Sequence, residues 1–213
     1  MEKIIFFRNA KLMDLKKVID IEKLINYEKF ESWFSYNYEM TEEEINFLKK
    51  LISANELYLS SYNEQKLSMR FIAQILNKVD FYFGDVFDWY ENEISCKIND
   101  FILKGKPYFI VANGIDEPEK PFFFLQEHKK FVNSSGNPEY QVLASMVTAI
   151  HMNNSKKIIG GFVIGKFWQF IILEKLENDS FEYFVSYSFD SLKIKDLEQI
   201  YKNLQAVKFL YCK

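Results

Sequence analysis

Apolar residues in the first quarter of the chain recur at the spacing of amphipathic helices. Leu15 and Ile19 lie four residues apart with two lysines between them, which places both on one face of a helix. Thr41 is followed three residues later by Glu44, the pattern of a capping box at a helix start. The spacing therefore predicts helices from about residue 9 to residue 56.

A further helix is predicted from residue 63 to about residue 78, after which the pattern changes. Leu67, Phe71 and Ile75 form the apolar stripe of this helix, and Glu64 lies in its first turn. The sequence after it contains apolar stretches with the length and composition of strands. Six strands are predicted, at about residues 94–103, 108–112, 122–127, 158–164, 168–173 and 181–186.

Two more helices complete the predicted order. Asn137 suits the N-cap position of one of them and Pro138 its first helical position, with Gln141 in the first turn. The other is predicted from Ser191 to about Val207 and closes the chain. Helices therefore alternate with groups of strands, and the sequence predicts an α/β or α+β layered domain whose first strands are mostly antiparallel.

The composition indicates a folded protein without an overall attraction to nucleic acid. The chain has 213 residues, 18% of them aromatic, and a formal charge of -3. This length and this aromatic content favour one domain with a large core, whereas overall attraction to nucleic acid needs a basic chain. Any contact with DNA must then come from a local basic patch. Five lysines are available for such a patch, unless they are ordinary surface residues: Lys129, Lys130, Lys156, Lys157 and Lys166.

The cysteines and the apolar segments favour the cytoplasm. Cys96 and Cys212 have neither the spacing of a zinc site nor that of a disulfide framework, which fits a reducing compartment. The longest apolar stretch, residues 162–173, is interrupted by Lys166 and Gln169 and is too short to span a bilayer. We therefore expect a cytoplasmic protein without a membrane partner.

The most informative stretch is the aromatic segment that ends in two opposite charges. Alternate residues of a strand share a face, so Glu127 and Lys129 point the same way, in line with Leu125. Burying charged side chains costs free energy unless they pair with each other or bind a ligand. The metal ion of a hydrolytic site is one such ligand. The alternative is a strand that ends near residue 126, with both charges in solvent.

Six segments of the chain form a set of sequence motifs that also occurs in a known protein family. They are Tyr62–Leu67 with Phe71–Ile72, Val111–Gly114, Pro121–Lys129, Asn137–Gln141, Gly160–Trp168 and Asp196–Ile200. In this order and spacing they resemble the PD-(D/E)XK nuclease superfamily, and within it a bacterial subfamily, over roughly residues 40 to 208. The resemblance implies a restriction-endonuclease-like core with a central mixed sheet flanked by helices in residues 59–213. Residues 1–58 are then an N-terminal helical extension packed on this core.

The same resemblance implies metal-assisted hydrolysis of phosphodiesters. In this family a Glu at the position of Glu127 and an Asp on the preceding strand hold Mg²⁺ or Mn²⁺, which activates water. Lys129 is implied to stabilise developing negative charge or to orient water, and Gln141 to orient the water, the lysine or a phosphate. The expected catalytic residues are thus Glu127, Lys129 and Gln141. The expected metal ligands are Glu127 and Glu64.

The chain departs from the family pattern at the position of the Asp, where it has Tyr108. Folding the hairpin about its turn places Tyr108 or Pro107 opposite Glu127. Asp116 lies in that turn and is too far along the ladder to substitute, at about 3.3 Å per residue. Asp100 belongs to the previous strand and approaches only with an unusual register. Restoring an acid by Tyr108→Asp is expected to raise Mn²⁺ affinity if the remaining site is intact.

Two functions remain open after this departure. One or two carboxylates hold Mg²⁺ weakly, which favours a protein with the nuclease fold, an incomplete metal site and weak or no activity. Such a protein acts as a module that binds nucleic acid or a protein, the latter through its N-terminal helices. The alternative is an active Mg-dependent deoxyribonuclease that uses Glu127, Lys129, Glu64 and Gln141. His128 is expected to face away from Glu127 and to have no catalytic role.

Overall fold

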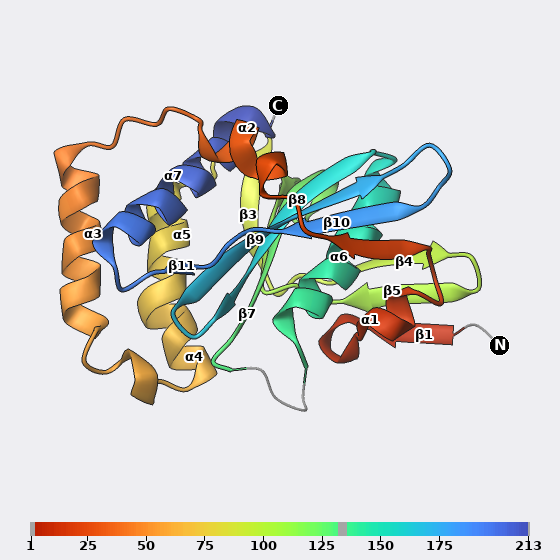
Figure 1. The fold of residues 1–213 in the computed structure, drawn as a ribbon, viewed down its shortest axis with the longest axis horizontal. Coiled ribbons are helices and arrows are strands. Elements are labelled where there is room, and N and C mark those ends of the chain that lie inside the picture. The colour runs from red at the N-terminus through yellow and green to blue at the C-terminus, as the bar shows by residue number, and fades with distance from the viewer. Residues whose placement is uncertain (1–2, 132–135, 213) are drawn as a thin grey trace.

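A mixed sheet of eight strands lies at the centre of the protein (Figure 1). The computed structural model describes residues 3–131 and 136–212. Across the sheet the strands follow the order β2-β10-β9-β8-β7-β6-β3, and β11 pairs with β9. Neighbours are antiparallel except for β2 with β10 and β7 with β8, which are parallel. The strands are β2 (Ile21–Leu24), β3 (Val86–Tyr90), β6 (Phe109–Asn113), β7 (Glu119–Lys129), β8 (Lys157–Ile164), β9 (Phe167–Lys175), β10 (Phe181–Val185) and β11 (Phe189–Asp190).

Helices cover both faces of this sheet, and a second sheet of order β1-β5-β4 lies on the α6 side (Figure 1). Helices α3, α4, α5 and α7 cover the other side. The small sheet consists of β1 (Lys3–Phe6), β4 (Ile94–Ile98) and β5 (Phe101–Gly105). The helices are α1 (Leu12–Leu15), α2 (Glu31–Phe34), α3 (Glu42–Asn55), α4 (Glu64–Leu67), α5 (Ala73–Val79), α6 (Pro138–Asn153) and α7 (Ile194–Leu210). The predicted α/β class, a large mixed sheet flanked by helices, is confirmed.

Several short elements connect the helices, and one of them joins α4 to α5. A π-helical stretch, Ser68–Ile72, links these two into one continuous helical segment, which confirms the helix predicted from residue 63. Short 3₁₀ turns occur at Phe7–Asn9, Tyr27–Phe30 and Leu59–Ser61. Within the described residues, no helix combines the length and the apolar character that a membrane span needs.

Most of the predicted strands are confirmed, and β7 is longer than predicted. It runs from Glu119 to Lys129, so the alternative of a strand that ends near residue 126 is wrong. The predicted strand 94–103 is instead the hairpin of β4 and β5. Its turn contains Asn99 with a φ of 52°, a left-handed conformation in which asparagine is common. The other five predicted strands match strands of the large sheet.

The N-terminal residues are less helical than their periodicity predicts. The capping box at Thr41 is present and begins α3, which confirms that helix. Residues 21–24, in contrast, form β2, and residues 3–6, which precede the predicted helices, form β1. The pairing of β2 with β10 buries Ile21, and such tertiary pairing outweighs the weak local preference of a short apolar pattern for a helix.

Two buried clusters lie on the two faces of the large sheet and fix α6 against β7 and β8. The cluster on the α6 side includes Leu125 and Met146, and the cluster on the other side includes Phe124. Gly160 of β8 permits the close approach, because a Cβ there would lie 2.7 Å from the Leu125 carbonyl oxygen and 2.8 Å from the Met146 sulfur. This packing holds the first turn of α6, with Gln141, against the same face of the sheet.

Candidate functional site

Three of the predicted site residues line one cavity. Glu127 and Lys129 lie two positions apart on β7, and Gln141 lies in the first turn of α6. All three face a cavity of about 380 Å³. Its other walls come from the N-terminal segment and from residues 105–106 at the end of β5. The structure thus brings these three side chains together, while their roles remain predictions.

Glu64 lies outside the cavity lining but is tied to it by an ion pair. Its Oε1 accepts a hydrogen bond from Nζ of Lys129 at 3.0 Å. The helix that carries Glu64 starts at an N-cap, where the side chain of Asn63 accepts the backbone N–H of Lys66 at 2.8 Å. Since Glu64 contacts the ammonium group directly, it neutralises part of the charge that Lys129 presents to the cavity.

The carboxyl group of Glu127 is surrounded by protein, although the residue keeps some exposed surface at the cavity. This burial raises the pKa of Glu127 to about 8, because the charged form loses hydration. The backbone N–H of Tyr108 and the charge of Lys129 lower the pKa, and the charges of Glu64 and Glu91 raise it. The protonated form therefore predominates near neutral pH, and a protonated carboxyl group is a poor metal ligand.

Tyr108 lies opposite Glu127 in the hairpin, which confirms the predicted register. The ladder between β6 and β7 ends with Phe109 opposite Gln126, so Tyr108 lies next to Glu127, one residue beyond the paired part of the hairpin. The Tyr108 backbone N–H also lowers the pKa of Glu127, which agrees with a position beside that carboxyl group. Of the two residues that the hairpin geometry left open, Tyr108 and not Pro107 is therefore the one opposite Glu127.

The side chain of Tyr108 nevertheless points away from the cavity. Ser68 of the π-helical stretch donates a hydrogen bond to the Tyr108 hydroxyl at 2.5 Å, and the Tyr108 ring lies edge-on against His128, with 4.0 Å between ring centroids. The chain bends at Tyr108 just before β6 begins, and this bend turns the side chain to the other face of the sheet. The Tyr108 ring therefore does not face the Glu127 carboxyl group, and the effect of an acid at position 108 stays a prediction.

His128 faces away from Glu127, as predicted. It is 7% exposed and packs against Tyr108. Burial lowers the pKa of His128 to about 4, an effect that the charge of Glu64 opposes. The ring is therefore neutral at physiological pH and belongs to the packing between the sheet and α4.

Gln141 is held in place by the N-terminal segment. Its Nε2 donates a hydrogen bond to the carbonyl oxygen of Arg8 at 2.7 Å. Parallel pairing of β1 with β5 positions this segment, and the Phe7 ring packs on Gly105, where a Cβ would lie 2.7 Å from it. A wall of the cavity thus comes from residues that the sequence suggested to be an extension of the core.

Two cations of the cavity, Arg8 and Lys106, were missed by the sequence analysis. Nothing in the sequence except their charge marks these two residues as part of a site. They reach the cavity through the pairing of β1 with β5, which no local pattern predicts. Of the five lysines considered for a basic patch, only Lys129 lines this cavity. Lys157 and Lys166 instead pair with carboxylates of β9 and β11. The expected set of lysines is therefore not gathered around Glu127, and Arg8 and Lys106 accompany Lys129 instead.

The side chains at the cavity do not form a complete metal site. Among the described residues, no group of three or more His, Cys, Asp or Glu side chains is placed to hold a metal ion. Two carboxyl groups line the cavity, those of Glu127 and Glu93, and Glu93 pairs with Lys104 at 3.2 Å. Mg²⁺ usually keeps several waters and takes one or two carboxylates together with substrate phosphates, so the described residues offer the ion that the resemblance implies only an incomplete set of ligands.

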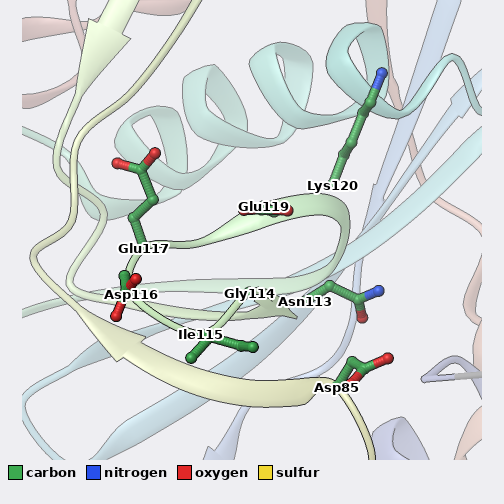
Figure 2. A pocket seen from close by; sticks show the side chains of 8 residues that line it. All are labelled: Asp85, Asn113, Gly114, Ile115, Asp116, Glu117, Glu119 and Lys120. Atoms are coloured by element: carbon green, nitrogen blue, oxygen red, sulfur yellow. The ribbon is translucent and has the colours of Figure 1, made fainter.

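A larger cavity of about 590 Å³ lies at the turn of the β6–β7 hairpin (Figure 2). Its lining includes Asp85, Asp116 and Glu117, and Figure 2 shows that these side chains splay in different directions. Asp116 thus lines a different cavity from Glu127, as the hairpin geometry predicts. Asp100 lies in the turn between β4 and β5 of the small sheet and does not substitute for the missing acid.

Comparison of the chain with protein-family models gives no match, and neither does comparison with curated proteins. The resemblance to PD-(D/E)XK nucleases therefore rests on the sequence motifs of this chain alone.

Proposed function

We propose that this chain is a protein of the PD-(D/E)XK nuclease type that binds nucleic acid through the cavity at Glu127 and hydrolyses it weakly or not at all. The main support is that Glu127 and Lys129 of one motif segment and Gln141 of another line one cavity. Lysine and amide side chains are suited to phosphate oxygens. The cavity is therefore suited to a phosphodiester even though its metal ligands are incomplete.

The electrostatics of the cavity support binding without turnover. Burial favours the neutral form of Glu127, and Glu64 is engaged by Lys129. The tyrosine at the position of the family's Asp turns its side chain to the opposite face. Each of these features weakens the hold on a divalent cation, while the positive charges around the cavity remain favourable to an anion.

A second candidate function is Mg-dependent hydrolysis of DNA. The observation in its favour is that two further acids, Glu64 and Glu91, lie close enough to Glu127 to raise its pKa. A cation at Glu127 would be attracted by the same charges. This function differs from the first in requiring cleavage that depends on Glu127.

Binding of labelled oligonucleotides in EDTA tests the first proposal. We expect fluorescence anisotropy to detect DNA binding without any divalent cation, with an affinity that falls as salt rises, because phosphate contacts release counterions. Adding Mg²⁺ should not strengthen binding, since no complete metal site contributes to it, and should weaken it as other salts do. Binding that appears only with Mg²⁺, or no binding at all, would refute the proposal.

A further inference from the structure

Two cations and an aromatic ring line the candidate cavity outside the motif residues. Arg8 and Lys106 are exposed, and neither has an ion-pair partner within the described part of the chain. Phe6 of β1 lines the same cavity and is 41% exposed. The Arg8 guanidinium lies 5.9 Å from the centroid of the Phe6 ring. An exposed ring beside unpaired cations is an arrangement that bases and phosphates of an unpaired strand can use together.

The positions of these residues are fixed by the fold. Pairing of β1 with β5 places Phe6 opposite Lys104, two residues before Lys106. The carbonyl oxygen of Arg8 is bound by Gln141 at 2.7 Å, so the backbone beside the guanidinium is anchored to α6. The ring and both cations are therefore held against the motif residues of β7 and α6, although they come from distant parts of the sequence.

We infer that Arg8 and Lys106 bind phosphate groups and that Phe6 stacks on a base, so that the ligand of this cavity is single-stranded nucleic acid. This inference rests on the proposed function and specifies its ligand. Arg8 offers a planar fork that matches phosphate oxygens, and Lys106 adds a point charge. In a duplex the bases are stacked on one another and are not free to lie on Phe6, so the ring favours unpaired bases.

The test measures the affinity of a labelled single-stranded DNA and of its matched duplex, in EDTA, for the intact protein and three variants. Arg8→Gln with Lys106→Gln should weaken binding of both DNAs by about tenfold and reduce the slope of log K against log salt by about 1 to 2. Phe6→Ala should weaken single-strand binding by about tenfold and leave duplex binding unchanged. Lys49→Gln with Lys50→Gln, on exposed positions of α3, makes the same change in charge and should alter neither.

The outcomes separate this inference from the proposed function. If DNA binds and the Arg8 and Lys106 variant binds it as well as the intact protein, the phosphate assignment is wrong and the proposed function stands. Equal affinity for both DNAs, or no effect of Phe6→Ala, overturns the single-strand assignment. If no DNA binds, the proposed function fails. Titration with inorganic phosphate then tests whether Arg8 and Lys106 bind phosphate groups. Phosphate binding that is lost in the double variant supports their role, and absence of phosphate binding overturns it.

Discussion

Replacing Tyr108 by aspartate is expected to destabilise the protein by at least about 3 kcal/mol and to leave its affinity for Mn²⁺ unchanged. Tyr108 is 9% exposed, packs against His128 and accepts a hydrogen bond from Ser68. The substitution removes a buried ring and places a carboxylate in an apolar region. Since the side chain lies on the opposite face of the sheet from the Glu127 carboxyl group, the new acid does not complete a metal site. Denaturant unfolding and Mn²⁺ titration measure the two effects.

Tyr108→Phe is the matched control for this substitution. It keeps the ring and removes only the hydroxyl that accepts from Ser68, so it should cost about 1 kcal/mol. A Tyr108→Asp variant with nearly normal stability and a higher affinity for Mn²⁺ would contradict the structure. That result would mean that position 108 faces Glu127 and that the family's metal site is one substitution away.

Glu127→Gln is expected to remove a pH dependence of folding stability of about 2 kcal/mol. The folded protein keeps a proton on Glu127 up to a pKa of about 8, whereas the unfolded chain releases it near 4.5. The folded state therefore binds more protons between these values. This contribution to stability is fully present below the unfolded pKa and is lost as the pH rises through the folded one. The expected change in stability is smaller than the full shift in the pKa of Glu127 corresponds to, because the residue keeps some contact with solvent.

Unfolding free energies measured from about pH 5 to pH 9 test this expectation. Glutamine has no titrating group, so the variant should lose less stability than the intact protein as the pH rises. Glu119→Gln, an exposed change on the same strand, should follow the intact protein. Parallel curves for the intact protein and Glu127→Gln would show that the Glu127 carboxyl group is ionised in the folded protein. Glu127 would then be available as an anionic metal ligand at neutral pH.

The elements around the site were predictable where a strong local signal marks them. Asn137 caps α6 by accepting the backbone N–H of Glu139, and the capping box at Thr41 begins α3. The aromatic run before Glu127 gave β7, and the alternation of side chains put Glu127 and Lys129 on one face. These signals lie within a few residues of the elements they specify, so they can be recognised without knowledge of the tertiary structure.

The parts that escaped prediction depend on contacts between distant segments. Strand β1 forms because residues 3–6 pair with residues 101–104, and no local pattern records that pairing. Arg8 and Lys106 join the cavity for the same reason. The register of the β6–β7 hairpin was predicted correctly, but the direction of the Tyr108 side chain was not. A bend just before β6 sets that direction, and the alternation of an ideal strand does not apply to a residue outside the ladder.

Cleavage of DNA is the measurement that tests the central claim most directly. Plasmid and single-stranded DNA are incubated with the intact protein and with Glu127→Ala, in Mg²⁺ and in Mn²⁺, and the products are separated by electrophoresis. We expect the DNA to be bound and to remain intact or be cut only slowly, because the carboxylates at the cavity do not complete a metal site. Rapid cleavage by the intact protein that disappears in Glu127→Ala would contradict the proposed function and establish an active nuclease.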